Sequence, residues 1–446
     1  MSTAGKLLTL AALGGLALVV MGARAAAQTP PSSAPEPSPA PVQQAADAGE
    51  AGFPSVTVTA EMREHQRWID ALYFGGTAYS VLALLGILAF GVSRRLRDAA
   101  ARVTSRPFLS AMVFFALFSV VLTLVTLPFD ALSGFVIPHR FDLSNQSFAG
   151  WLGEQGKGLA IGIVLGAPLI ALALTGIRRV RRWWLALWLG TVPVAVFLLL
   201  VGPVVLDPVF NQFKPLQDQE LRTEILDLAA RAGIEGGRVY EVDKSKQTKT
   251  MNAYVNGIGP TKRIVLWDTT IKGMTRDEVR FVMAHEMAHY VLHHVWKGLG
   301  FILALFLAVF WAGQRVVERA TTRWGRQWGF EVPHDPAAVP LLLLAVTVGV
   351  FLVTPAINGM SRHFEHEADT FALELTHLNR DGARAFVKLA ENSKVLPAPS
   401  PFIRFWRYSH PPLAERIDFC RAYHPWTEGV ANRVWHGGTG AGPAGS

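Results

Sequence analysis

Long runs of hydrophobic residues dominate this chain of 446 residues and decide its fold class. Six of these runs approach or reach the length of about 20 residues that an α-helix needs to cross a bilayer. The predicted spans are residues 71–91, 108–128, 158–177, 184–206, 298–313 and 339–357. The fifth is the shortest. The pattern therefore predicts a mainly α-helical, polytopic membrane protein.

Basic loops between the runs predict how the spans are oriented. Arginines gather in residues 94–106, 178–182 and 315–326, which follow the first, third and fifth runs. Arginine and lysine accumulate in cytoplasmic loops, so these loops are predicted to lie inside the cell. By alternation, residues 207–297 and 358–446 are predicted to lie on the extracytoplasmic side.

The first 28 residues have the pattern of a secretory signal peptide. A short start with Lys6 precedes an apolar stretch, and the small residues Ala23, Ala25 and Ala27 follow. An uncleaved signal anchor is the alternative, and both deliver the next segment to the outside. Residues 29–56 contain a stretch rich in Pro, Ala and Ser without apolar periodicity, so they are predicted to form a disordered tether.

A less hydrophobic stretch between the fourth and fifth runs predicts a compact soluble part. Residues 218–232 have apolar positions at helical spacing, whereas 238–243 and 262–270 have the pattern of strands. Residues 249–255 could form an edge strand, to which an extended peptide would bind by main-chain hydrogen bonds. A plain surface hairpin is an equally good interpretation of that segment.

Residues 275–294 follow this soluble part and are predicted to be a helix. Thr275 and Glu278 form a capping box, and apolar residues recur behind them at helical spacing. Residues four apart lie on one face of a helix, so His285 and His289 can offer their imidazole nitrogens to a single ion.

The histidine pair and Glu286 between them are typical of a zinc hydrolase. In such a site the histidines bind the metal, and the glutamate removes a proton from water. The alternative is a chance HExxH on an ordinary amphipathic helix. His293 continues the same face, and we expect it to be solvated or to lie behind the ligands.

A second predicted helix, residues 358–377, offers a third ligand. Glu365 and Asp369 share one face of it. Glu365 would complete a set of two histidines and one carboxylate, leaving a fourth position for water. Asp369 could hold a ligand histidine through its other nitrogen. Glu367 is an alternative ligand by spacing, and a solvated acidic face is the other interpretation.

His410 is a further candidate, immediately before two prolines that suit a helix start. A histidine close to the metal could stabilise the oxyanion of a tetrahedral intermediate. Simple packing or capping at the helix start is the alternative role, and spacing along the chain does not distinguish the two.

Composition and charge narrow the classes of function. The net charge is +8, but the basic residues flank apolar runs and form no patch interleaved with aromatics. This pattern argues against nucleic acid as a partner and attributes the charge to membrane topology. Cys420 is the single cysteine, which excludes an internal disulfide. It also argues against a closed structural zinc site, since such sites prefer cysteine ligands.

Several motifs in chain order resemble the type I CAAX prenyl protease-like family of integral-membrane zinc metalloendopeptidases, which are HExxH gluzincins. The resemblance is carried by residues 127–137, 207–216, 252–271, 285–289, 361–372 and 409–417. It implies a barrel of membrane helices around a chamber, joined to a zincin-like peptidase domain with a small β-sheet. It also implies roles for individual residues: one Zn²⁺ per chain on His285, His289 and Glu365, Glu286 as general base, His410 as transition-state donor, and Asn252, Asp369 and Arg362 in support.

The resemblance alone does not predict the substrate of this chain. Eukaryotic members of the family remove the terminal residues of farnesylated, cysteine-ended proteins. This chain departs from the family in its signal-like start and in residues 138–144, which lack the usual acidic, glycine-containing turn. We therefore expect this chain to hydrolyse peptide bonds in membrane or envelope proteins. CAAX processing is the activity that the resemblance to the family suggests.

The sequence as a whole predicts a membrane-embedded zinc metalloendopeptidase. Its parts are a signal segment 1–28, a tether 29–56, a multi-span domain 57–206, a peptidase domain 207–424 with two spans, and a disordered tail 425–446. The expected partners are a peptide or protein substrate and a bilayer, here a bacterial inner membrane, with the site on the extracytoplasmic side or in a chamber. The alternative is a noncatalytic zinc-binding membrane chamber or chaperone, against which the intact catalytic set argues.

Overall fold

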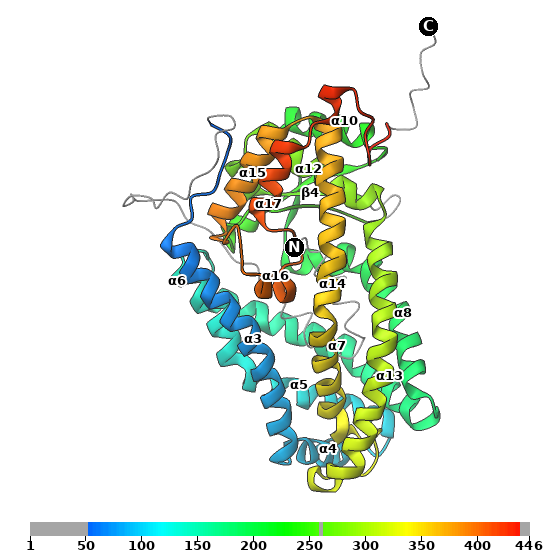
Figure 1. Ribbon diagram of the computed structural model, residues 1–446. Helices are drawn as coiled ribbons and strands as arrows, with labels where there is room; N and C mark the ends of the chain where they lie inside the picture. The colour runs from blue at the N-terminus through cyan, green and yellow to red at the C-terminus, as the bar shows by residue number, and fades with distance from the viewer. Residues whose placement is uncertain (1–51, 258–261, 438–446) are drawn as a thin grey trace.

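The computed structural model describes residues 52–257 and 262–437, so the predicted signal segment lies outside the described residues. Within these ranges six helices are long and apolar enough to cross a membrane. They are α3 (Ala60–Ala89), α5 (Pro107–Ala131), α7 (Phe148–Arg179), α8 (Trp183–Val201), α13 (His294–Trp328) and α14 (Val339–Thr376). Each overlaps one predicted span, although α13 is much longer than the predicted 298–313, so the prediction of a polytopic helical membrane protein is confirmed (Figure 1).

The six long helices pack in a closed ring, in the order α3, α5, α7, α8, α13, α14 and back to α3. The short helix α4 (Val92–Val103) lies across one end of the ring, at the bottom of Figure 1. There Ser93 Oγ donates to the carbonyl of Ala337 at 2.7 Å, and Arg97 pairs with Asp335 at 2.9 Å. The predicted barrel is therefore present, and α4 covers its arginine-rich end.

The two longest helices of the ring continue well beyond the depth of a bilayer. α13 has 35 residues and α14 has 38. At the helical rise, α14 is about 57 Å long, whereas the hydrocarbon core of a membrane is about 30 Å thick. α14 is accordingly buried near both ends, over 339–343 in the ring and over 368–375 in the peptidase part. This one helix joins the membrane ring to the soluble part.

A four-stranded sheet lies in the peptidase part, in the order β1-β2-β4-β3. The strands are β1 (Phe213–Pro215), β2 (Arg238–Val242), β3 (Ala253–Asn256) and β4 (Arg263–Trp267). β2 and β4 are parallel, while β1 and β3 pair antiparallel at the two edges. The two predicted strands are present in slightly shorter form, and the segment 249–255 contributes an edge strand from Ala253 onward.

The other helices build the core of the peptidase part around this sheet. Those of the described residues not yet given bounds are α6 (Ile137–Arg140), α9 (Asp207–Phe210), α10 (Gln219–Arg231), α11 (Asp268–Gly273), α12 (Arg276–Val291), α15 (Asn379–Asn392), α16 (Pro401–Arg407) and α17 (Leu413–Ala422). α12 lies at the centre, in contact with α10, α14, α15 and β3. Its residues Phe281, Met283 and Met287 are fully buried.

Two segments predicted to be disordered are packed where the structure describes them. Phe53 and Val56, at the end of the predicted tether, pack against the peptidase core. In the predicted tail, the buried carboxylate of Glu374 accepts hydrogen bonds from the backbone N–H groups of Arg433, Val434 and Trp435 at 2.6, 2.9 and 2.7 Å. The prediction was wrong for these residues because a few apolar side chains and one buried acceptor stabilise otherwise polar segments.

Candidate active site

Helix α12 carries the HExxH motif, and its start is fixed by the predicted capping box. Thr275 Oγ1 accepts from the N–H of Glu278 at 3.4 Å, and the Glu278 carboxylate accepts from the N–H of Thr275 at 2.7 Å. Lys388 of α15 also binds that buried carboxylate, at 2.7 Å. These contacts, together with the buried apolar face, set the position and rotation of α12.

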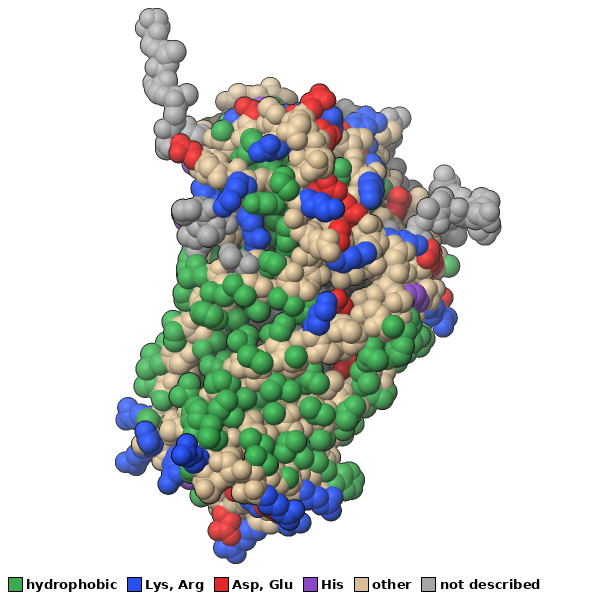
Figure 2. Space-filling model, turned by 180° about the vertical axis from the view of Figure 1, so that it is seen from behind, with side chains coloured by type: hydrophobic (Ala, Val, Ile, Leu, Met, Phe, Trp, Pro, Cys, Tyr) green, Lys and Arg blue, Asp and Glu red, His purple; other side chains and the backbone are tan. Residues whose placement is uncertain are grey.

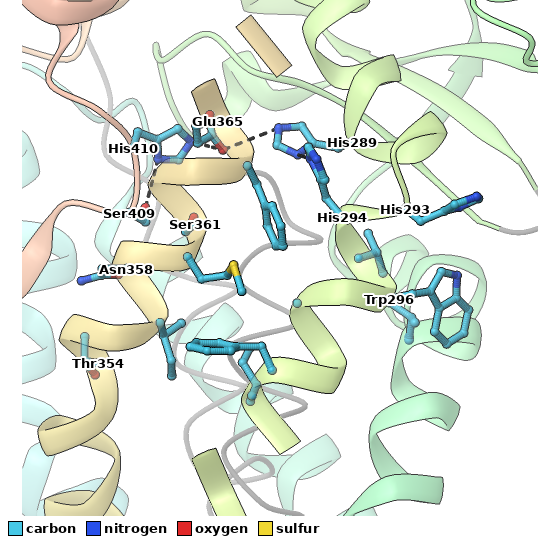
Figure 3. A pocket seen from close by; sticks show the side chains of 18 of the residues that line it. His289, His293, His294, Trp296, Thr354, Asn358, Ser361, Glu365, Ser409 and His410 are labelled. Carbon is cyan, nitrogen blue, oxygen red and sulfur yellow. Dashed lines mark hydrogen bonds and ion pairs between the residues drawn. The ribbon is translucent and has the colours of Figure 1, made fainter. Parts of the chain in front are cut away.

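Three side chains converge where α12 meets α14. Nε2 of His285 lies 3.3 Å from Nε2 of His289, and the Glu365 carboxylate lies 3.2 Å from the first and 3.5 Å from the second. These ligand atoms all lie within 4.8 Å of one another. Figure 3 shows Glu365 directed at His289 across the gap between the helices.

The converging atoms fit a metal ion. The Glu365 Oε2 atom is buried and lies 3.2 Å from Nε2 of His285, but it makes no hydrogen bond among the described residues, although a buried carboxylate oxygen ordinarily has a donor. A cation bound between the two imidazole nitrogens and the carboxylate would satisfy all three groups at once. Two histidines and one carboxylate are also the ligand set of catalytic zinc sites, which keep one position open.

A buried ion pair supports His285 from behind. Nδ1 of His285 lies 2.9 Å from the carboxylate of Asp369. Arg416 of α17 donates to both oxygens of that carboxylate, at 2.8 and 2.6 Å. The predicted contact between Asp369 and a ligand histidine is thus present. Arg416 lies within the 409–417 motif, but no local pattern in the sequence predicts its role. A buried arginine close to two carboxylates could not be recognised without the tertiary contacts.

The electrostatic environment of α12 suits a bound cation. Burial raises the pKa of Glu286 to about 7 and lowers the pKa of His289 to about 4. Burial also disfavours the charged form of His285, but Asp369 and Glu365 outweigh it and raise the pKa of His285 to about 9. The two buried carboxylates therefore favour positive charge at this point, which a metal ion would supply.

A cavity of about 570 Å³ opens beside the three converging groups. Glu286, His289, Glu365 and His410 line it at one end, together with the end of edge strand β3 and the residue after it, Asn256 and Gly257. Apolar side chains of α13 and α14 line it towards the membrane ring. Asn256 and Gly257 lie within the 252–271 motif, but no local pattern in the sequence indicates that they line a cavity.

His410 lies next to the converging groups. Its Nε2 is 3.1 Å from Glu365 Oε1, and its Nδ1 is 3.0 Å from the hydroxyl of Ser409 (Figure 3). The segment that carries it is held by two residues of α14. Asn358 donates to the carbonyl of Trp406 at 2.8 Å, and Arg362 donates to that of Tyr408 at 2.6 Å.

The remaining candidates lie further from the three converging groups. Arg362 holds the backbone before His410, as just described. Asn252 precedes β3; its side chain accepts from the N–H of Ala253 at 2.9 Å and is not among the described residues that line the cavity. Glu367, the alternative ligand, faces His294 at 3.0 Å instead. The structure therefore favours Glu365 over Glu367 as the third converging group.

Comparison with known proteins shows which family this chain belongs to. Residues 215–424 match peptidase family M48, and residues 65–212 match the CAAX prenyl protease N-terminal region of five membrane helices. The chain is 35% identical over 369 residues to an uncharacterized metalloprotease, YhfN, of Bacillus subtilis, covering 82% of this chain and 85% of that one. The chain belongs to peptidase family M48. This M48 peptidase is therefore a membrane-embedded metalloprotease, and the family membership disfavours the noncatalytic alternative.

Two further relatives extend the likeness of this M48 peptidase. It is 32% identical over 295 residues to the CAAX prenyl protease 1 homolog of Arabidopsis thaliana, covering 65% of this chain and 68% of that one. The crystal structure of S. mikatae Ste24p matches with a TM-score of 0.72 and 25% identity, over 81% of this chain and 88% of that one. The ring of membrane helices and the peptidase part are thus shared with a solved structure.

Proposed function

We propose that this metalloprotease is a zinc-dependent endopeptidase, with one Zn²⁺ per chain held by His285, His289 and Glu365. The observation that carries the proposal is the convergence of their ligand atoms within 4.8 Å, with one buried Glu365 oxygen left without a hydrogen bond. Zinc, when bound, supplies a Lewis acid that polarises the scissile carbonyl and makes water more acidic.

The side chains around this position would supply proton transfer, stabilisation of the oxyanion and orientation of a ligand. Glu286 lines the cavity, and burial raises its pKa to about 7, so it can take a proton from the attacking water and pass it to the leaving amine. His410 lies on the far side of Glu365 and can donate a hydrogen bond to the oxyanion. Asp369 and Arg416 keep the ring of His285 in the required orientation.

The substrate we propose is an extended segment of a membrane or envelope protein. β3 is an edge strand of the described sheet, and its last residue, Asn256, lines the cavity beside Glu286. A peptide added along this edge would place its carbonyls next to the converging groups. The relatives named CAAX prenyl protease make a prenylated terminus the competing substrate, and the apolar walls of the cavity suit either one.

We further propose a bacterial inner membrane with the peptidase part on the extracytoplasmic side. A bacterial relative at 35% identity supports a bacterial membrane. The arginine loops support the extracytoplasmic side, because they gather at the end of the ring that carries α4, opposite the peptidase part.

The proposed function is tested with purified protein and a Glu286→Gln variant. We expect about one zinc per chain in both proteins, and peptide cleavage by the wild type that a chelator abolishes and added zinc restores. The variant should cleave about 100- to 10,000-fold more slowly, since only the proton transfer is lost. A mixed peptide library with a farnesylated member reports the substrate class. Cleavage by the variant at the wild-type rate, or by the zinc-free protein, would contradict the proposal.

A further inference from the structure

A second row of side chains runs from His289 away from the converging groups. Nδ1 of His294 lies 3.0 Å from Nδ1 of His289, and Nε2 of His294 lies 3.0 Å from a carboxylate oxygen of Glu367. Figure 3 shows the rings of His289 and His294 close together, while His293 points away from both. We infer that His294 and Glu367 are positioning residues that orient His289 and strengthen its hold on the metal, which rests on the proposed function.

The chemistry of the imidazole rings allows one arrangement of protons along this row. Nε2 of His289 faces His285 and Glu365, so a metal ligand at that atom leaves the proton of the ring on Nδ1. Nδ1 of His294 must then accept, and its Nε2–H donates to Glu367. The carboxylate at the end of the row raises the basicity of His289 through the intervening ring, as acceptors behind metal ligands do.

A sharp turn of the chain builds this contact. α12 ends at Val291, His293 adopts a left-handed conformation with φ 56°, and α13 begins at His294. The turn separates the two helices and brings the ring of His294 against that of His289, five residues earlier. His294 is 4% exposed, and its ring stacks on Phe364 of α14 with centroids 4.4 Å apart. The ring of His294 therefore has little freedom to rotate.

Helix α14 supplies both the proposed ligand Glu365 and the residues that support the proposed ligand His289. Phe364 and Glu367 lie within two residues of Glu365 in α14, so one helix determines the positions of all three side chains. The supports of the two histidines differ. His285 is held directly by the buried Asp369, whereas His289 is held through a ring whose partner, Glu367, is 31% exposed. Loss of the His294 ring should therefore matter more than loss of the Glu367 charge.

The test measures zinc release to a competing chelator from purified full-length protein. The variant His294→Phe keeps the stack on Phe364 but removes the acceptor, and we expect it to release zinc about 10- to 100-fold faster than the wild type. His294→Asn restores an acceptor facing His289 and should recover part of the loss. Glu367→Gln should have a smaller effect than His294→Phe.

His293→Asn is the matched control, because asparagine tolerates the left-handed conformation and this side chain points away from His289. It should release zinc at the wild-type rate. The absorption spectrum of the cobalt-substituted protein gives a second readout, and it should shift in His294→Phe and stay unchanged in His293→Asn.

Three results would overturn the inference. If the wild type holds zinc and both His294→Phe and Glu367→Gln release it at the wild-type rate, the inference fails and the proposed function stands. If His294→Phe lowers only the unfolding temperature of the zinc-free protein, the role is structural and the inference again fails. If the wild type binds no zinc, the proposed function itself fails, and the inference fails with it.

Discussion

Arg416 shows at the scale of one residue how the site carries its charge. Its side chain is 6% exposed, and that of its partner Asp369 is 1% exposed. Charges removed from water are tolerated when they are paired and hydrogen-bonded, and this guanidinium binds both oxygens of the carboxylate. The pair lies against His285, so the same contacts that satisfy the buried charges also orient a proposed metal ligand.

The variant Arg416→Met should therefore destabilise the protein strongly. It keeps most of the packing over the ring of Phe386 but leaves the Asp369 carboxylate buried with a weaker set of donors. We expect a loss of about 3–5 kcal/mol in the free energy of unfolding. The double variant Arg416→Met with Asp369→Asn should recover part of that loss, because it removes the unpaired charge. Thermal unfolding of the single and double variants measures the coupling, and simple additivity would contradict it.

At the scale of the element, α12 and α14 determine the geometry of the site. α12 carries its two histidines on one face because they are four residues apart, and the capping box fixes where the helix begins. α14 continues unbroken from the membrane ring to Glu365 despite Pro355 within it, which cannot donate a backbone hydrogen bond. One continuous helix therefore connects the membrane ring to Glu365, the third proposed ligand.

The cap of α12 is open to a direct test with Thr275→Ala. Loss of the hydroxyl removes the acceptor for the N–H of Glu278, and we expect a cost of about 0.5–2 kcal/mol in stability. Zinc affinity should fall by a smaller factor, since the buried face of α12 still holds the helix. Thr275→Ser retains the acceptor and should behave like the wild type in thermal unfolding. Equal behaviour of the Ala and Ser variants would show that the cap does not stabilise α12.

The whole molecule has the surface of a protein that sits across a membrane with one end outside it. Hydrophobic side chains cover a broad band in Figure 2, lysines and arginines gather below it, and both signs of charge mix above it. The lower end carries α4 and the arginine loops, and the upper end is the peptidase part (Figure 1). Basic residues favour the cytoplasmic side, so the peptidase part is predicted to lie outside.

Cysteine labelling in intact cells checks this orientation. Cys420 is fully buried, so the native chain should give little background. A membrane-impermeant maleimide should label Glu235→Cys, an exposed position of the peptidase part, without permeabilisation. Arg326→Cys, at the arginine-rich end, should be labelled only after the membrane is opened, because its side chain is 89% exposed on the other face. The reverse pattern would invert the proposed topology.

Much of this architecture is encoded by local patterns. The six spans follow from runs of apolar residues, since a bilayer selects helices by length and hydrophobicity alone. His285 and His289 lie together because four residues make about one helical turn. The same periodicity in a second helix predicts Glu365, because a catalytic zinc site with two histidines needs a third protein ligand. Asp369, one turn later, reaches His285 as expected.

Contacts between distant residues were decided by the tertiary structure alone. Arg416 meets Asp369 across 47 positions of sequence, and Glu367 meets His294 across 73. The tail residues 433–435 bind Glu374, although their composition predicts disorder. A local pattern indicates which face of an element is apolar. It does not indicate which buried charge or ring lies on the element that packs against that face. Those partners come together only once the helices have packed, and they orient the proposed ligands that the local patterns predict.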